Sequence, residues 1–232
     1  MDFDSFVLCA STSDLREEPA ARDHADAVEF RMDLAADPLA ALDEYDGELP
    51  ILATNRVDWE GGEAADDPAR LAALATAAEH EAVEAVDIEL AAFTDDADAV
   101  AARAAEQARE HGTKIVVSAH DFEGTYDAEE MAETLDAAGD YGDVAKLAIA
   151  AEVPLDVLEL LAVTREFAAE GECVATMAMG EVGSHSRVVA PTYGSRIGYA
   201  PVDPADATAP GQLPLETMRE LVSTLSTKPE TY

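Results

Sequence analysis

Short apolar runs, several rich in β-branched residues, alternate with longer alanine-rich stretches along the chain. A short apolar run between turn residues is typical of a buried strand, whereas apolar residues that recur every three or four positions predict an amphipathic helix. The predicted strands are residues 5–10, 27–32, 50–56, 85–90, 114–120, 143–150, 173–179 and 196–200. The clearest predicted helices are residues 64–83, 95–111, 127–138 and 154–170.

Eight strands that alternate with helices predict a (β/α)8 barrel, which typically needs about 250 residues; this chain has 232. The rival architecture is a doubly wound open sheet, but ASTSDL stands after the first strand in place of the GxGxxG fingerprint. No Pro-, Gly- or Ser-rich linker interrupts the interior, so residues 1–232 are predicted to form a single domain. Residues 201–214, rich in Pro and Ala, are expected to form a long loop.

Several predicted strands carry charged residues where a buried parallel strand is ordinarily apolar. Alternation places Glu29, Arg31 and Asp33 on one face of the second strand, opposite Phe30 and Met32. Burying a charge costs several kcal/mol unless it is paired, so these residues form either a structural Glu29–Arg31 pair or part of a site. Further polar pairs that share a strand face are Thr54 and Arg56, Asp87 and Glu89, and Ser118 and His120. Because barrel active sites lie at the C-terminal ends of the strands, these side chains predict a site there.

Lys146 lies inside the apolar run VAKLAIA, and it is one of only three lysines in the chain. Burial disfavours the ammonium and so favours a nucleophilic amine, which can form a Schiff base with a ketone. The alternative is a lysine that reaches solvent from a strand end or pairs with a carboxylate. His120, on the neighbouring predicted strand, supplies a base that titrates near neutrality and favours the catalytic interpretation.

No histidine or cysteine spacing is typical of a metal site, and no cofactor is expected. Cys9 and Cys173 lie in separate apolar runs and are expected to be reduced core residues. The N-terminal segment MDFDSFVLCA is acidic, and no apolar stretch approaches the roughly 18 residues of a membrane span. A soluble, cytoplasmic protein is therefore expected.

The chain is strongly acidic, with 14 Lys and Arg against 50 Asp and Glu and a formal net charge of −36. Such a surface repels nucleic acids and anionic lipids, so neither is expected as a partner. The surface also repels itself at low ionic strength, whereas the Debye length falls to about 3 Å at 1 M salt. The composition therefore predicts adaptation to the salty cytoplasm of a halophile.

The chain resembles the type I 3-dehydroquinate dehydratases through motifs that occur in the family's order. These motifs are EFRMD, ILATNRVDWEGG, VVSAHDFEGT, DVAKLAI, MAMGEVGSHSRVVAPTYGS and APGQ. The resemblance runs from the second predicted strand almost to the last helix, roughly four-fifths of the chain. It implies a (β/α)8 barrel, commonly a homodimer, that dehydrates 3-dehydroquinate to 3-dehydroshikimate in the shikimate pathway without a metal.

The resemblance also implies roles for individual residues. Lys146 matches the Schiff-base lysine, and His120 matches the general acid/base. Glu60 matches a carboxylate that orients the histidine and raises its basicity. The positions that match substrate-binding residues are Glu29, Arg31, Arg56, Arg187, Thr208 and Gln212. A substrate-contacting serine of the first strand is either Ser11 or absent.

Two of the expected substrate-binding residues belong to predicted loops. Arg187, in the GSHSR loop after the seventh strand, is expected to clamp the substrate carboxylate with its planar guanidinium. The same loop is a common phosphate site in barrels, so phosphate remains a weaker alternative. Gln212 belongs to the 201–214 loop, which is expected to close over the site. Thr208, in that loop, stands where the family often has serine.

Two other functions remain open from the sequence. Another Schiff-base barrel of the aldolase type would share Lys146 but not the GxxSR and APGQ pairing. A non-catalytic barrel that binds a small carboxylate would explain the arginines, but it gives no reason for Lys146 and His120 to occur together.

Overall fold

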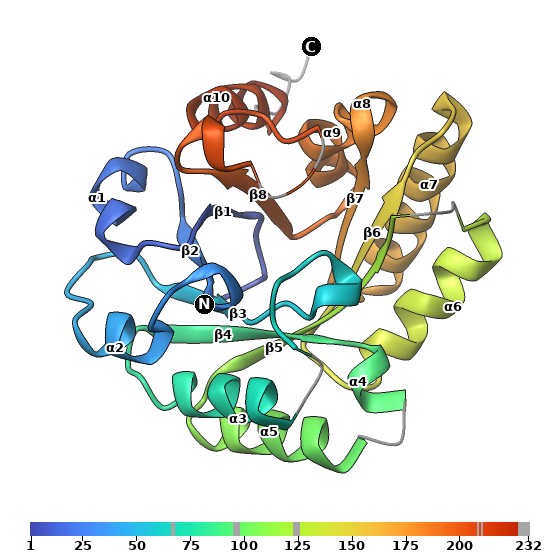
Figure 1. Cartoon of the computed structure of the whole chain (residues 1–232). Coiled ribbons are helices and arrows are strands. Elements are labelled where there is room, and N and C mark those ends of the chain that lie inside the picture. Colours follow the sequence, from blue (N-terminus) through green and yellow to red (C-terminus); the bar gives the residue numbers. More distant parts are fainter. Residues whose placement is uncertain (66–67, 95–97, 123–125, 208, 210, 227–232) are drawn as a thin grey trace.

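The computed structural model describes residues 1–65, 68–94, 98–122, 126–207, 209 and 211–226, so Thr208 lies outside the described residues. Within them, eight parallel strands pair in the order β7-β6-β5-β4-β3-β2-β1-β8. The sheet curls until β7 and β8 are neighbours, where the Arg196 N–H donates to the Val174 carbonyl at 2.8 Å. Helices surround the strands (Figure 1). The predicted (β/α)8 barrel is therefore confirmed.

Each predicted strand is present. The strands are β1 (Val7–Thr12), β2 (Ala27–Arg31), β3 (Ile51–Thr54), β4 (Val83–Glu89), β5 (Lys114–Asp121), β6 (Val144–Ala150), β7 (Val174–Met179) and β8 (Ile197–Pro201). The α-helices are α1 (Glu18–Ala21), α2 (Pro38–Asp43), α3 (Pro68–Ala77), α4 (Ala91–Thr94), α5 (Asp98–Glu110), α6 (Ala128–Gly139), α7 (Pro154–Glu170), α8 (Gly180–Gly183), α9 (Ser186–Tyr193) and α10 (Leu215–Ser226). Short 3-10 turns are η1 (Leu15–Glu17), η2 (Met32–Leu34), η3 (Asp58–Glu60) and η4 (Pro204–Asp206).

Helix boundaries differ from the prediction in the first half of the chain. The predicted helix 64–83 is too long, because α3 ends at Ala77 and Val83 already begins β4. The separating turn is closed by the His80 N–H donating to Ala77 O and the Val83 N–H donating to His80 O. The prediction for 154–170 is confirmed: α7 starts at Pro154 and ends before Gly171, whose φ of 94° favours glycine.

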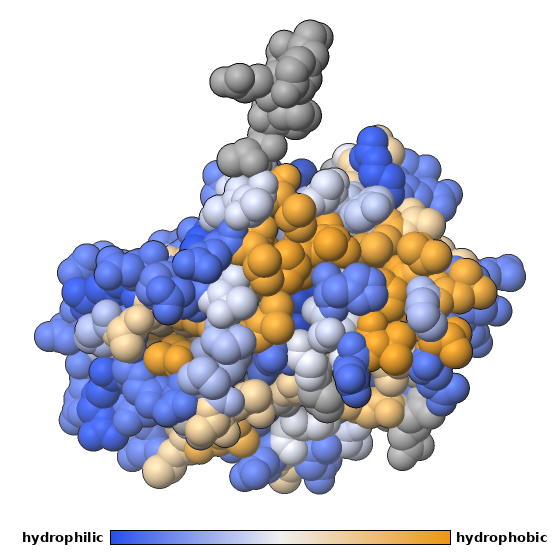
Figure 2. Space-filling view, turned by 90° about the horizontal axis from the view of Figure 1, so that it is seen from above, coloured by the Kyte–Doolittle hydropathy of each residue, from blue (hydrophilic) through white to orange (hydrophobic). Residues whose placement is uncertain are grey.

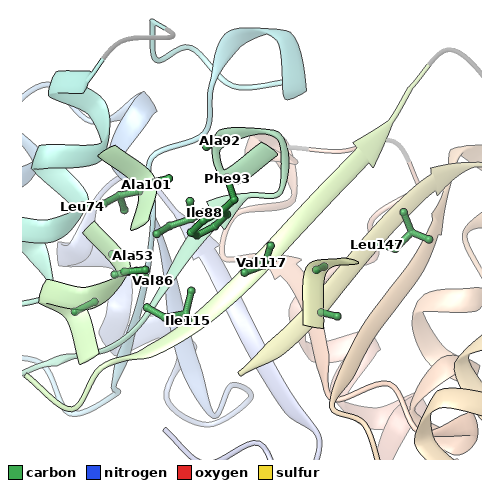
Figure 3. Packing of buried hydrophobic residues seen from close by; sticks show 14 of the residues in the cluster. Ala53, Leu74, Val86, Ile88, Ala92, Phe93, Ala101, Ile115, Val117 and Leu147 are labelled. Atoms are coloured by element: carbon green, nitrogen blue, oxygen red, sulfur yellow. The ribbon is translucent and has the colours of Figure 1, made fainter. Parts of the chain in front are cut away.

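The strands separate an apolar layer outside the barrel from an interior that holds the charged side chains. Val86 and Ile88 of β4 join the cluster between strands and helices, with Leu74 of α3 and Ala101 of α5 (Figure 3). Successive side chains of a strand point to opposite faces. The intervening Asp87 and the following Glu89 therefore point into the barrel.

A second apolar cluster fills the lower part of the barrel interior and supports the site from below. Its members include Cys9, Ala27, Leu52, Val116, Val144, Ile197 and Tyr199. Cys9 is fully buried as predicted, whereas Cys173 is only half-buried. Among the described residues, no helix has both the length and the apolar character needed to cross a bilayer.

Candidate active site

A pocket opens at the C-terminal ends of the barrel strands and holds ≈ 500 Å³ of empty space, part of it continuous with solvent. This is the end of the barrel at which the sequence predicts the site. The predicted site residues that line the pocket are Glu29, Arg31, Arg56, Glu60, His120, Lys146, Arg187 and Gln212. Every predicted site residue within the described part of the chain is thus brought to one cavity.

Lys146 lies on the inner face of β6, and only 3% of its surface is exposed. Its Nζ lies 2.9 Å from Asp87 Oδ2 on β4 and 4.5 Å from the centre of the Tyr199 ring on β8. The lysine therefore does not reach solvent from a strand end; it is a buried amine with a carboxylate partner. It still lines the pocket, so its side chain borders the space that a ligand would occupy.

Asp87 joins Lys146 to a wider ionic network. Its Oδ2 lies 2.9 Å from an Arg56 guanidinium nitrogen, and its Oδ1 accepts a 2.6 Å hydrogen bond from the Ser118 hydroxyl. Burial by itself would raise the pKa of Asp87, but Arg56 and Lys146 outweigh it and hold that pKa below its usual range. Asp87 is therefore an ionised counter-charge for both cations and not an acid near neutrality.

Arg56 follows β3 and extends across the interior to β4 and β5. It donates to Glu89 Oε1 at 3.0 Å and to Ser118 Oγ at 2.7 Å. Glu89 receives a second arginine, because Arg70 of α3 donates to its Oε2 at 2.6 Å. Arg56 is thus held by fixed carboxylates, and its position in the pocket is set before any ligand binds.

His120 and Glu60, which the resemblance implies to be the general acid/base and the carboxylate that orients it, are hydrogen-bonded to each other. His120 lies near the end of β5, Glu60 ends η3, and Nδ1 lies 2.8 Å from Glu60 Oε2. Burial raises the pKa of Glu60 to about 8. Burial, and then Arg56 and Lys146, lower the pKa of His120 well below its usual value. The effect of Glu60 itself on the basicity of His120 stays a prediction.

Phe122 covers the imidazole at the pocket mouth. The rings of His120 and Phe122 stack with an interplanar angle of 10° and centroids 6.1 Å apart. Gly61 lies beneath the same phenyl ring: its φ is +79°, and a Cβ there would come within 2.7 Å of Phe122. The positive φ therefore favours glycine at this position, directly after Glu60.

Glu29 and Arg31 point into the barrel, but they do not form the ion pair that the structural alternative required. Glu29 accepts hydrogen bonds from Ser11 Oγ at 2.5 Å and Thr54 Oγ1 at 3.1 Å. Arg31 instead makes a two-pronged pair with Asp33, at 2.9 and 2.6 Å. Asp33 is available because β2 turns directly into η2 and brings this carboxylate back beside the arginine.

Arg187 lies in α9 and not in the loop that the sequence predicts, because Ser186 already starts the helix. It is 4% exposed, and burial lowers its pKa to about 10, so it remains a cation at neutral pH. A buried cation that lines a pocket favours an anionic ligand, which restores the stabilisation lost with water.

Gln212 lies on the segment that follows β8. Its Oε1 accepts from the Ala209 N–H at 3.3 Å, and both residues line the pocket. Gly211 has a φ of +79°, and a Cβ there would come within 2.5 Å of the Gly180 carbonyl oxygen. The segment is therefore seated closely against the start of α8, beside the pocket mouth.

Alternation with Glu89 predicts Asp87 only as a polar side chain inside the barrel, and its contact with Lys146 was not among the predictions. Tyr199 was not predicted as a site residue. Tyr199 has a weaker signal: it shares the inner face of β8 with Ile197 and resembles an ordinary core residue. Among the described residues, no group of three or more His, Cys, Asp or Glu side chains is arranged to hold a metal ion.

Comparisons with known proteins agree with this geometry. Residues 7–229 match the family model described as type I 3-dehydroquinase. A 3-dehydroquinate dehydratase of Haloarcula marismortui is 61% identical over 97% of this chain and 98% of its own length. The one from Halobacterium salinarum is 54% identical over 97% of this chain and all (100%) of its own. Both organisms are haloarchaea, which agrees with the adaptation to salt predicted from the acidic composition.

Solved structures show the same architecture. The crystal structure of 3-dehydroquinate dehydratase from Geobacillus kaustophilus superposes with a TM-score of 0.82 at 29% identity, covering 98% of this chain and 93% of that one. The enzyme from Aquifex aeolicus gives a TM-score of 0.82 at 27% identity, covering 96% of this chain and 100% of that one. With its motifs, its barrel and its buried lysine beside a histidine–carboxylate pair, the chain belongs to the type I 3-dehydroquinase family.

Proposed function

We propose that this protein is a hydro-lyase that dehydrates 3-dehydroquinate to 3-dehydroshikimate through an imine on Lys146. The observation that carries the proposal is the buried Lys146 amine, which lines the pocket one strand away from His120. In the register of β5 and β6, Lys146 is level with Ser118, and His120 lies two positions nearer the mouth. A ketone bound over the lysine therefore presents its neighbouring carbon to the imidazole.

Imine formation needs the free amine. Neutral His120, in the form that pairs with ionised Glu60, takes a proton from the Lys146 ammonium, and the amine then attacks the C3 ketone carbon of the substrate. The ketone oxygen takes up a proton and leaves as water, so that a protonated imine remains. Asp87, 2.9 Å from Nζ, stays ionised and compensates this positive charge.

Elimination follows from the chemistry of the imine. The iminium withdraws electrons from the C2–H bond, and His120 removes that proton to give an enamine. The enamine electron pair then expels the C1 hydroxyl, which leaves as water with the proton from His120. A second water hydrolyses the imine, releasing 3-dehydroshikimate and the free amine of Lys146. No metal or redox change is needed for this sequence of steps.

The substrate carboxylate is assigned to Arg187. This arginine is buried from bulk solvent, cationic and part of the pocket lining. Its planar guanidinium matches the geometry of a carboxylate. Arg31, Arg56 and Glu29 are proposed to bind the ring hydroxyls, because each is already held by fixed partners and lines the same cavity. Gln212 is proposed to contact the substrate from the segment after β8. The same role is proposed for Thr208, which lies outside the described residues.

Substitution of the lysine tests the proposed function. Lys146→Ala is expected to abolish formation of 3-dehydroshikimate, followed by its ultraviolet absorbance. Lys114→Ala is the matched control, because this lysine is exposed and pairs with Asp143 on the surface. Turnover by Lys146→Ala at the wild-type rate would refute the proposal. Aldol cleavage of a sugar phosphate without dehydration would favour an aldolase, and binding without turnover in the wild type would favour a carboxylate-binding barrel.

We also propose a homodimer that forms through an apolar face. Hydrophobic side chains gather in a band on the face seen in Figure 2. Exposed apolar residues of the helices α7 and α10, which both pack against α9, are Leu155, Leu158, Leu221 and Leu225. Covering such a face removes apolar surface from water in a chain whose net charge of −36 otherwise opposes self-association.

The oligomeric state is measurable by size-exclusion chromatography with light scattering in molar KCl. The wild type is expected to elute as a dimer and Leu158→Glu as a monomer with an unchanged unfolding temperature. A monomeric wild type would refute the dimer.

We place the protein in the cytoplasm, since its two cysteines, Cys9 and Cys173, are free thiols.

A further inference from the structure

Tyr199 is a buried aromatic residue that the proposed reaction has not used. It lies on β8 with 4% of its surface exposed, and its register partner on β1 is Cys9. Its ring lines the pocket, and Lys146 Nζ lies 4.5 Å from the ring centre. Among the residues that the structure describes, the Tyr199 hydroxyl has no hydrogen-bond partner.

We propose that the face of the Tyr199 ring positions the Lys146 nitrogen and stabilises the positive charge that this nitrogen carries in the iminium. The inference rests on the proposed function, because it assumes that Lys146 forms the imine. An aromatic face attracts a cation within about 6 Å of its centre, and the attraction is strongest where water is excluded. Both conditions hold here, since Lys146 is 3% exposed.

The nitrogen is held between two different partners. Asp87 contacts it from β4 at 2.9 Å, and the Tyr199 ring contacts it from β8. The carboxylate supplies a directional ionic contact, whereas the ring supplies a broad face that tolerates a change from ammonium to planar iminium. The ring therefore continues to favour the charged nitrogen after the carbon–nitrogen bond has formed.

The hydroxyl of Tyr199 is not required for this role. Burial raises the pKa of the phenol well above its usual value, so the group stays neutral and does not act as a second anion beside Lys146. Removing a buried hydroxyl that makes no hydrogen bond costs little stability. Tyr199→Phe is therefore expected to keep the rate of imine formation within about two-fold of the wild-type rate.

The test separates the ring face from the volume of the side chain. Imine formation with 3-dehydroquinate is quenched at short times with borohydride, and the rate of adduct formation at Lys146 is measured by mass spectrometry. Tyr199→Leu and Tyr199→Met remove the ring and are expected to slow this rate about ten- to thirty-fold. Tyr193→Leu, at a 40% exposed tyrosine of α9, is the control.

A fluorinated series keeps the test decisive if the aliphatic variants do not fold. Phenylalanine with one, two or three ring fluorines at position 199 alone preserves the shape but withdraws electron density from the ring face. The proposal predicts a stepwise fall in the rate with each fluorine. If the folded fluorinated variants all form the adduct at the same rate, and the wild type still forms it at Lys146, this inference alone is overturned. A wild type that is never trapped at Lys146 would overturn the proposed function and this inference together.

Discussion

The Glu60 carboxyl and the His120 imidazole share a 2.8 Å hydrogen bond although they belong to different elements, η3 and β5. Burial raises the pKa of Glu60 to about 8 and lowers that of His120 well below its usual value. These opposite shifts favour the proton on Glu60 at neutral pH, from where it is donated to Nδ1 of a neutral imidazole. In this state the other nitrogen, Nε2, carries the ring proton and is not available as a base.

The base form of this pair is expected to appear only as the pH rises. Loss of the Glu60 proton leaves Nδ1–H donating to a carboxylate and frees Nε2, so kcat/KM is predicted to increase through a pH of about 8. Glu60→Gln removes the titrating group. This variant is predicted to lose the increase in kcat/KM near pH 8 and to have a lower maximal rate. A pH profile of kcat/KM for both proteins decides the matter. If kcat/KM of Glu60→Gln rises with pH in the same way, the increase belongs to another titrating group.

Loss of the imidazole is expected to separate the two halves of the reaction. His120→Ala keeps Lys146 and its partner Asp87, so imine formation persists, slowed by the loss of the proton acceptor. Elimination should fall by about 10²- to 10⁴-fold, which is the usual contribution of a general base. Borohydride reduction should then trap an adduct that retains the substrate's C1 hydroxyl, heavier by one water than the product adduct. Product adduct at the wild-type rate would show that another base acts.

Asp87→Asn is predicted to destabilise the fold by about 3 kcal/mol, because it leaves Arg56 and Lys146 with less counter-charge in a buried place. Asp136→Asn, at an exposed position of α6, is the control. Denaturant unfolding at constant KCl concentration measures both variants. Equal stability of the two would contradict the ionic role of Asp87.

The same carboxylate makes stability depend on acid. The pKa of Asp87 is depressed in the folded protein, so its contribution is complete above the unfolded value of about 3.9 and decreases as the pH falls below it. The unfolding free energy of the wild type should therefore fall more steeply in acid than that of Asp87→Asn. If the unfolding free energies of the two proteins fall in parallel below that pH, the depressed pKa of Asp87 is contradicted.

Salt is expected to improve substrate binding. The net charge of −36 repels an anionic substrate, and the Debye length shrinks from about 8 to about 3 Å between 0.15 and 1 M salt. KM for 3-dehydroquinate is therefore predicted to fall several-fold across this range of KCl, with circular dichroism as the control for folding. A KM that rises with KCl would indicate that competition for Arg187 outweighs the screening.

Much of the site could be predicted from alternation along the strands. Charges at every second position of β2 and β4 can only face the barrel, and sequential strands are neighbours, so Lys146 and His120 had to lie close together. The partner of Arg31 could not be predicted in this way. Asp33 reaches it because the chain turns into η2 at Met32, a local geometry that alternation does not describe.

Other features depend on three-dimensional surroundings. The start of α9 at Ser186 placed Arg187 in a helix, although the glycines and polar residues before it resemble a loop. The location of the proton in the Glu60–His120 pair follows from burial, and sequence contains no direct measure of burial. The role of Tyr199 could not be predicted for a similar reason, because only the closure of the barrel brings β8 close to Lys146.

Covalent trapping at Lys146 tests the central claim most directly. The protein is incubated with 3-dehydroquinate in molar KCl, reduced with borohydride, and weighed intact and after digestion, beside Lys146→Ala. The account predicts a single stable adduct on the peptide that contains Lys146 and none in the variant. A folded, active wild-type protein that forms no adduct, or one that carries it on another lysine, would contradict the imine mechanism.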